Sequence, residues 1–192
     1  MKKIIVGGWA WLTAAVLLLG SVAVSDLRAA SDKPITFVQI TDTHNGLPVH
    51  AYRFRAAIDA INKLPFDIAV VAHTGDFACD DLYKKATCIE ITNMLSRIKK
   101  PLICAPGNHD LSMKGIDPAK RLADCLKAYT TFIGPLGQVY ETEDAVFIAV
   151  CTEPLRGTMP AIPGFDPIVW MDEQLSKTKG KPVFVFTHVP DG

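Results

Sequence analysis

Residues 102–110 read LICAPGNHD, a short apolar run that ends in a cluster of polar side chains. The same arrangement occurs at three other places. Apolar residues 35–40 precede Asp42-Thr43-His44, residues 68–72 precede Gly75-Asp76, and residues 183–186 precede Thr187-His188. Short apolar runs that are rich in β-branched residues and bounded by turn residues are typical of buried strands. The sequence therefore predicts four strands, each followed by polar residues.

Helical patterns lie between these strands. Helices are predicted over residues 51–63, 82–99 and 118–132, with a further helix at residues 170–175 before the last strand. Residues 139–141 and 145–150 are typical of a hairpin, and residues 154–167, which include four prolines and two glycines, of a long loop. The alternation of strand and helix predicts an α/β fold in which the four motif-bearing strands run parallel.

Parallel strands place their carboxyl ends at one edge of a sheet, where open α/β sheets bind ligands. We therefore expect six polar residues to converge there: Asp42, His44, Asp76, Asn108, His109 and His188. Carboxylate, amide and imidazole groups together suit Zn, Fe, Mn or Co better than Ca, which prefers oxygen alone. Asp76 follows the central strand of the first three, which makes it the natural candidate for a carboxylate that bridges two cations.

The charge of such a site indicates its chemistry. With Asp42 and Asp76 as the only anionic ligands, two divalent cations would leave a net charge of about +2, which favours a phosphate group and a hydroxide. Two metal ions can hold both oxygens of an in-line displacement, and a metal can lower the pKa of bound water to about 7. The predicted reaction is phosphoester hydrolysis.

The order Asp-x-His, Gly-Asp, Gly-Asn-His-Asp and a later His resembles the calcineurin-like metallophosphoesterase superfamily, over residues 42–188. The resemblance implies a layered sandwich of mixed β-sheets flanked by helices, incomplete at the C-terminus. It also implies two divalent metal ions and a small phosphoester substrate, either a phosphomonoester or a phosphodiester, that is attacked by a metal-bound hydroxide.

The resemblance assigns a role to each motif residue. Asp42 and His44 would bind the first metal, Asp76 would bridge both, and Asn108 and His188 would bind the second. His109 would protonate the leaving oxygen or stabilise the transferring phosphoryl group, Asp110 would orient His109, and Asn108 would also contact the substrate.

Arg156 lies in the long loop at 154–167, a possible wall of the substrate site. It could contact phosphate there, although an exposed arginine without a ligand is the commoner situation.

Two departures from the family pattern affect the expectation. The Gly-His-x-His motif, which should follow His188 and complete both metal shells, does not occur before Gly192, and Cys79 stands where many relatives carry Asp or Asn. We expect residues 31–192 to be the N-terminal portion of a metallophosphoesterase domain. The alternative is a non-catalytic remnant that binds phosphate or a nucleotide.

The N-terminus predicts export. Lys2 and Lys3 precede an uncharged apolar stretch, so residues 1–30 are expected to be a signal peptide or an N-terminal membrane anchor. The protein would then be periplasmic or secreted, possible membrane anchoring being the alternative to cleavage. Twenty basic and twenty acidic residues balance, and this leaves no broad positive field for nucleic acid.

Five cysteines are an odd number for an exported protein, so at least one thiol is expected to be free unless it pairs between chains or with the absent part of the domain. Cys104 and Cys151 lie in or beside apolar runs and are predicted to be buried small hydrophobes. Cys79 and Cys88 are the better candidates for reactive or bridged thiols, and Cys125 is left unassigned.

Overall fold

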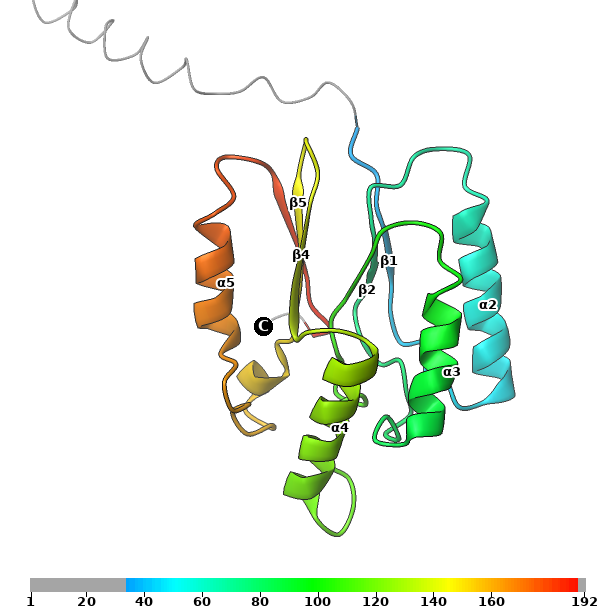
Figure 1. Ribbon diagram of the computed structural model, residues 1–192, viewed down its shortest axis with the longest axis vertical. Helices are drawn as coiled ribbons and strands as arrows, with labels where there is room; N and C mark the ends of the chain where they lie inside the picture. The colour runs from blue at the N-terminus through cyan, green and yellow to red at the C-terminus, as the bar shows by residue number, and fades with distance from the viewer. Residues whose placement is uncertain (1–33, 190–192) are drawn as a thin grey trace, which may run out of the picture. The chain divides into compact units, whose positions relative to one another are not determined.

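Two three-stranded sheets form the centre of the fold in the computed structural model, which describes residues 34–189 (Figure 1). The first sheet is parallel, in the order β1 (Val38–Ile40), β2 (Val71–His73), β3 (Leu102–Cys104). The second has the order β4 (Gly137–Glu141), β5 (Val146–Val150), β6 (Val183–Phe186); β4 is antiparallel and β6 parallel to β5. The predicted hairpin is therefore present as β4 and β5.

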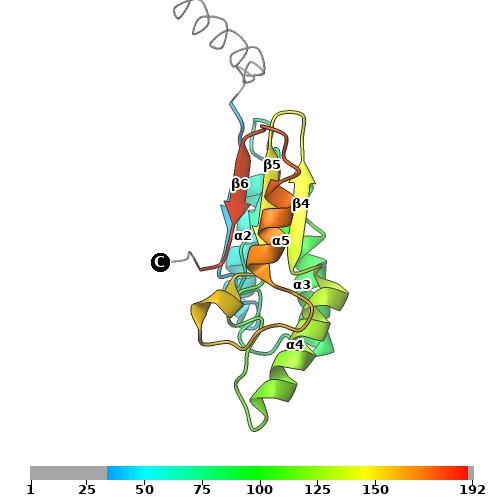
Figure 2. The same ribbon diagram turned by 90° about the vertical axis from the view of Figure 1, so that its left-hand side faces the viewer.

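Helices cover the outer faces of both sheets. α2 (Pro48–Asn62) and α3 (Lys85–Leu95) lie beside the first sheet, and α4 (Pro118–Phe132) packs next to α3 (Figure 1). α5 (Pro167–Leu175) lies over the second sheet, preceded by the short 3-10 helix η1 (Glu153–Arg156) (Figure 2). This arrangement confirms the predicted layered sandwich of mixed sheets flanked by helices.

The apolar side chains divide into layers that explain why the strands are so uniformly hydrophobic. Alternate residues of a strand point to opposite faces. Phe147 and Ala149 of β5 thus face the first sheet, while Val146, Ile148 and Val150 face α5. All five residues of β5 are buried, as expected of a strand that is covered on both sides.

Helix starts follow the capping chemistry of the sequence. α4 begins at Pro118 as predicted, since the side chain of Asp117 accepts a hydrogen bond from the backbone N–H of Lys120. α3 begins three residues later than predicted. The backbone at Asp80 is left-handed (φ 65°) and that at Lys84 is extended, which prevents a helix from starting at Leu82.

The prediction that all four motif-bearing strands lie in parallel at one sheet edge is wrong for the fourth. β6 pairs with β5 in the second sheet, not with β1, β2 or β3. The two sheets pack face to face through residues such as Ala72, Ile103 and Phe186. As a result, the loop after β6 still reaches the loops that follow the first sheet.

The predicted signal peptide or anchor at residues 1–30 lies outside the described residues. Among residues 34–189, no helix has the length and apolar character needed to cross a membrane.

The five cysteines are free thiols, and Cys104 and Cys151 are buried as predicted. The expectation for Cys88 is wrong. Its side chain is fully buried, and its thiol donates to the carbonyl of Leu82.

Candidate metal centre

The loops that follow β1 and β2 are joined by backbone hydrogen bonds at the candidate site. The N–H of Asp42 donates to the carbonyl of Gly75 over 3.0 Å, and the N–H of His44 donates to the carbonyl of Asp76 over 2.8 Å. Asp42, His44 and Asp76 all have left-handed backbones, with φ of 54°, 42° and 55°. Residues other than glycine adopt this conformation at a cost, and it is concentrated at functional sites. The two loops therefore hold each other in a strained shape that directs all three side chains inward.

Two motif glycines allow a third loop to approach. A Cβ at Gly75 would lie 2.4 Å from the backbone nitrogen of Gly107, and a Cβ at Gly107 would lie 2.3 Å from Oδ1 of Asp76. No side chain fits at either position. The glycines are thus needed for the contact that brings Asn108 and His109 beside Asp76.

The buried carboxylate of Asp76 lies between two groups of potential ligands. Its Oδ2 is 3.6 Å from Nε2 of His44, and its Oδ1 is 3.5 Å from Nε2 of His188. Oδ1 of Asp42 lies 3.7 Å from Nε2 of His44, and Nε2 of His109 lies 4.0 Å from Oδ2 of Asp76. Two triads of ligand atoms result, His44-Asp76-His109 and Asp42-Asp76-His188, and both contain Asp76.

The hydrogen bonds of His44 and His188 fix their tautomers. Nδ1 of His44 contacts the carbonyl of Ala78 at 3.3 Å, and Nδ1 of His188 contacts the carbonyl of Thr74 at 2.8 Å. A carbonyl oxygen only accepts, so each Nδ1 carries the proton and each neutral ring presents the lone pair of Nε2 to the centre. Metal-binding histidines are held in this way.

The surroundings of His188 favour a cation. Its Nε2 lies 3.1 Å from Oδ1 of Asn108 and 3.5 Å from Oδ1 of Asp76, so a neutral ring would direct a lone pair at two oxygens. Burial alone would lower the pKa of His188, but the hydrogen bond and the charge of Asp76 raise this pKa to about 9. A proton on Nε2 satisfies the oxygens, and a metal ion in its place would do the same.

The distances between donors also fit a metal ion. Ligands bound tetrahedrally at about 2.1 Å are separated from one another by roughly 3.4 Å. The separations of 3.5–3.7 Å among Asp42, His44, Asp76 and His188 are close to that value. The five predicted metal ligands thus lie together. Asp42 contacts His44, both His44 and His188 contact Asp76, and Asn108 contacts His188.

His109 is held from both ends. Its backbone N–H donates to Oδ1 of Asp76 over 2.9 Å, and its ring lies 5.0 Å from that of His44, nearly perpendicular to it. Its Nδ1 is 3.0 Å from Oδ1 of Asp80, an ion-pair contact rather than an aligned hydrogen bond. Lys114 contacts the other oxygen of Asp80 at 2.6 Å. Burial alone would raise the pKa of Asp80, but hydrogen bonds from Lys114 and Ser112 and the contact with His109 lower it.

The prediction that Asp110 orients His109 is not supported by the contacts, and Asp80 occupies that position. The carboxylate of Asp110 is completely buried and accepts from the backbone N–H groups of Ala78 and Gly107 over 3.0 and 2.9 Å. Burial raises the pKa of Asp110 to about 7. Asp110 therefore connects the Gly-Asp loop to the Gly-Asn-His-Asp loop. The sequence signal for Asp80 was its position directly after Cys79 in the loop that follows the Gly-Asp motif.

The ring of His73 forms hydrogen bonds with both of the first two motifs. The N–H of Gly75 donates to its Nδ1 over 3.3 Å, so Nε2 carries the proton and donates to the hydroxyl of Thr43 over 3.0 Å. The ring stacks on Phe77 with centroids 3.7 Å apart. Burial lowers the pKa of His73 to about 3, which keeps the ring neutral.

Arg156 forms an ion pair with Glu153, a residue that the sequence analysis did not identify. Its guanidinium lies 3.2 Å from Oε2 of Glu153, which is 1% exposed, and the second oxygen of Glu153 has no partner among residues 34–189. Burial raises the pKa of Glu153. The predicted contact of Arg156 with phosphate stays a prediction.

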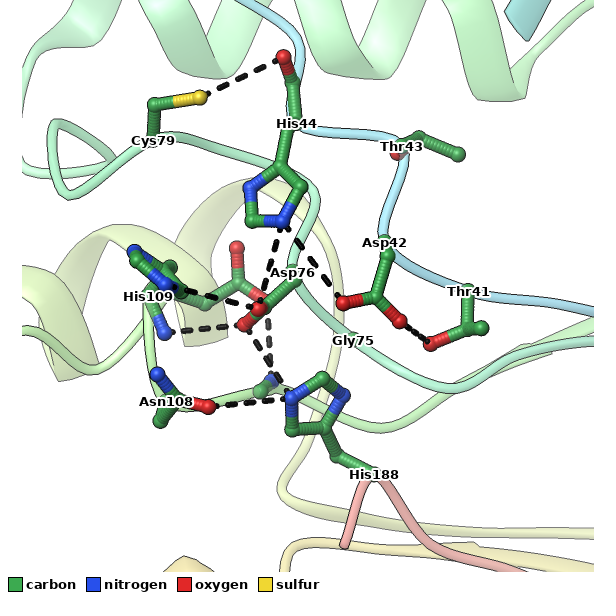
Figure 3. Close-up of polar contacts among 12 residues, drawn as sticks. Thr41, Asp42, Thr43, His44, Gly75, Asp76, Cys79, Asn108, His109 and His188 are labelled. Carbon is green, nitrogen blue, oxygen red and sulfur yellow. Dashed lines mark hydrogen bonds and ion pairs between the residues drawn. The ribbon is translucent and has the colours of Figure 1, made fainter.

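The exposed thiol of Cys79 lies beside the centre and donates to the carbonyl of His44 over 3.5 Å (Figure 3). Desolvation, followed by the charges of Asp81 and Asp80, raises the pKa of Cys79. These acidic neighbours favour the protonated thiol over the reactive thiolate.

Comparison with known proteins identifies the family. The profile described as calcineurin-like phosphoesterase matches residues 35–192. No curated protein sequence matches the chain.

The solved structures that share the fold include two phosphatases. One is the purple acid phosphatase PPD1 from yellow lupin (Lupinus luteus) seeds, with a TM-score of 0.54 and 16% identity over 78% of this chain. The chain covers only 29% of that enzyme's length. The other is a dimetal phosphatase from Danio rerio, with a TM-score of 0.52 and 14% identity over 82% of this chain and 71% of its own length.

Proposed function

This chain belongs to the calcineurin-like phosphoesterase family, and from that membership and the geometry of the candidate metal centre we propose that it is a phosphohydrolase dependent on two divalent metal ions. The reaction is the hydrolysis of a phosphomonoester or phosphodiester. Asp42 and His44 would hold the first ion, Asn108 and His188 would hold the second, and Asp76 would be shared by both. When bound, such ions neutralise the charge of a phosphate group and lower the pKa of a coordinated water.

The observation that carries the proposal is the position of the Asp76 carboxylate. One of its oxygens faces His44 and the other faces His188, at 3.6 and 3.5 Å. A carboxylate that served only as a partner for one histidine would need one such contact. Two contacts on opposite oxygens suit a residue shared by two ions.

His109 is the proton donor in this proposal. The carboxylate of Asp80 lies 3.0 Å from Nδ1, where it can pair with the positive charge that the ring carries whenever Nε2 holds the proton to be transferred. In that state His109 can donate a hydrogen bond to a phosphate oxygen and then give its proton to the leaving alcohol. Its own backbone bond to Asp76 keeps the ring at the centre during the reaction.

We also propose that the protein is exported to the periplasm or secreted. The support is the sequence alone: two lysines at residues 2 and 3 precede an uncharged apolar stretch. A substrate outside the cytoplasm would follow from this location.

Metal content and turnover of the 192-residue chain test the function. Elemental mass spectrometry should find two metal ions per chain after Mn or Zn is added. The loaded chain should hydrolyse p-nitrophenyl phosphate, bis-p-nitrophenyl phosphate or both. Full metal content with no turnover would favour the alternative, a protein that binds phosphate or a nucleotide without hydrolysing it.

Two variants separate the assigned roles. Asp76→Asn should lose bound metal, whereas Asp59→Asn, a matched change on the exposed face of α2, should keep it. His109→Ala should keep metal while kcat falls by roughly 10²–10⁴, the range for a lost acid or base group. Unchanged turnover in His109→Ala would exclude its proposed role.

A further inference from the structure

A small cavity opens directly beside the candidate metal centre, between the end of β1 and the first half of α2. Its volume is about 280 Å³, and Asp42 and His44 form one wall. Ile40, Phe54 and Ala57 supply apolar lining, and His50 and Arg53 contribute polar groups from α2. None of the roles assigned above to the metal centre uses His50 or Arg53. The cavity is thus contiguous with the site of hydrolysis but has its own chemistry.

The orientation of His50 is fixed by the metal-site loop itself. Its Nδ1 contacts the carbonyl oxygen of His44 at 3.0 Å, so Nδ1 carries the proton and Nε2 is left for another partner. The rings of His44 and His50 are 6.2 Å apart. His50 therefore lies one side chain away from a proposed metal ligand, on the cavity wall.

Arg53 is an exposed cation that lines this cavity. Arg97 and Arg156 form ion pairs with carboxylates, and Arg121 stacks on Tyr83 with its guanidinium carbon 3.7 Å from the ring centroid. Arg53 has no hydrogen bond or ion pair with its side chain among residues 34–189. The carboxylate in the cavity wall, that of Asp42, accepts a hydrogen bond from the hydroxyl of Thr41 over 2.6 Å and lies 3.7 Å from Nε2 of His44.

Charge and size together define what the cavity can hold. An unpaired guanidinium next to a site with excess positive charge favours an anion, and arginine binds phosphate through two parallel hydrogen bonds. The volume is at the low end of the roughly 300–1,000 Å³ that is typical of ligand pockets, so the bound group is small. A second phosphate fits both the volume and the charge of the cavity.

We propose that this cavity binds a second phosphate group of the substrate, with Arg53 as its contact. The substrate class is then a small organic bisphosphate, one phosphate lying at the metal centre and the other in the cavity. The inference rests on the proposed function of the metal centre, which supplies the first phosphate site.

The test measures binding rather than turnover, with probes that cannot be hydrolysed. Isothermal titration of the Mn-loaded chain compares propane-1,3-diphosphonate with propylphosphonate, which differ only in the second anionic group. The diphosphonate should bind about 10- to 100-fold more tightly, the range expected for one charged hydrogen-bonded contact. Arg53→Met should abolish this preference.

Arg55→Met is the matched control, because Arg55 lies on the same helix, is exposed like Arg53, and among residues 34–189 donates only to the carbonyl of Ala51. It should retain the preference for the diphosphonate. Equal binding of both probes by the unaltered chain, or a preference that survives Arg53→Met, would overturn the inference. Because phosphonates are not substrates, a chain that hydrolyses no ester but prefers the diphosphonate would refute the proposed enzyme and leave the second site standing.

Discussion

Replacement of Gly107 by alanine tests whether the close approach of the motif loops positions the metal ligands. The added Cβ would lie 2.3 Å from Oδ1 of Asp76, 2.6 Å from the backbone nitrogen of Asp76 and 2.9 Å from Cε1 of His188. Ordinary contact begins at 3.4 Å, so the carboxylate must retreat by about 1 Å. A rotation of the side chain alone cannot relieve the contact with the backbone nitrogen, and the whole loop must shift.

A shift of this size is large for a metal site. Metal–ligand distances are held within about 0.2 Å, so a movement of about 1 Å removes Asp76 from its position between the two ions. We expect Gly107→Ala to weaken Mn binding by at least about 100-fold, because the shared ligand is lost to both ions. Overpacking of a tight site should also lower the free energy of unfolding by about 1–3 kcal/mol.

Gly157→Ala separates the loss of the ligand from a general loss of stability. Gly157 has a φ of 70°, so alanine is strained there by about 1–2 kcal/mol, but its Cβ would meet no atom within 4 Å. Urea unfolding in the presence of a chelator and titration with Mn are measured for both variants. Both should be destabilised, and only Gly107→Ala should lose metal affinity. Unchanged Mn affinity in Gly107→Ala would refute the link between the glycine contact and the metal centre.

Three further predictions follow from individual contacts. In the metal-free chain His188 is protonated below its pKa of about 9, and it must lose that proton to bind a metal. The affinity for Mn, measured by titration calorimetry, should therefore rise about tenfold per pH unit from pH 6.5 to 8.5. A flat profile would contradict this reasoning. Asp80→Asn should lower kcat about 10- to 100-fold with metal content unchanged, whereas the neighbouring control Asp81→Asn should leave kcat near its original value; equal effects would remove Asp80 from its role. Tyr129→Phe should raise the free energy of unfolding by about 1 kcal/mol, because it removes a completely buried hydroxyl that has no hydrogen-bond partner among the described residues. A clear loss of stability in urea unfolding would show that the hydroxyl does have a hydrogen-bond partner.

The elements that the sequence predicted well are those with a local physical signal. α4 could be located because Asp117 and Pro118 supply the cap and the first helical residue. The four apolar runs identified strands because burial on both faces requires unbroken hydrophobicity. Sheet membership has no such signal, since β6 would have the same composition in either sheet. Its partner β5 was assigned correctly only to a hairpin with β4.

Residues that act at a distance in sequence were the hardest to assign. Asp110 directly follows His109, but neighbours along the chain point in different directions, and its carboxylate is buried beneath the loop. Asp80 lies 29 positions before His109 in the sequence. Its carboxylate reaches the imidazole of His109 because Asp110 joins the loops of Ala78 and Gly107. Glu153 gave no signal at all, because nothing in its local sequence distinguishes a buried glutamate from an exposed one.

The position of His188 shows why the second sheet is part of the candidate site and not only a cover for the first. Its ring is fixed by the carbonyl of Thr74, which directly follows β2 in the first sheet, although its own strand belongs to the second. The contact therefore depends on the packing between the sheets, through side chains such as Ala72 and Phe186. A metal ion shared between Asp76 and His188 would in turn join the two sheets, because it binds only when they are packed. Metal binding and the packing of the two sheets should therefore stabilise each other.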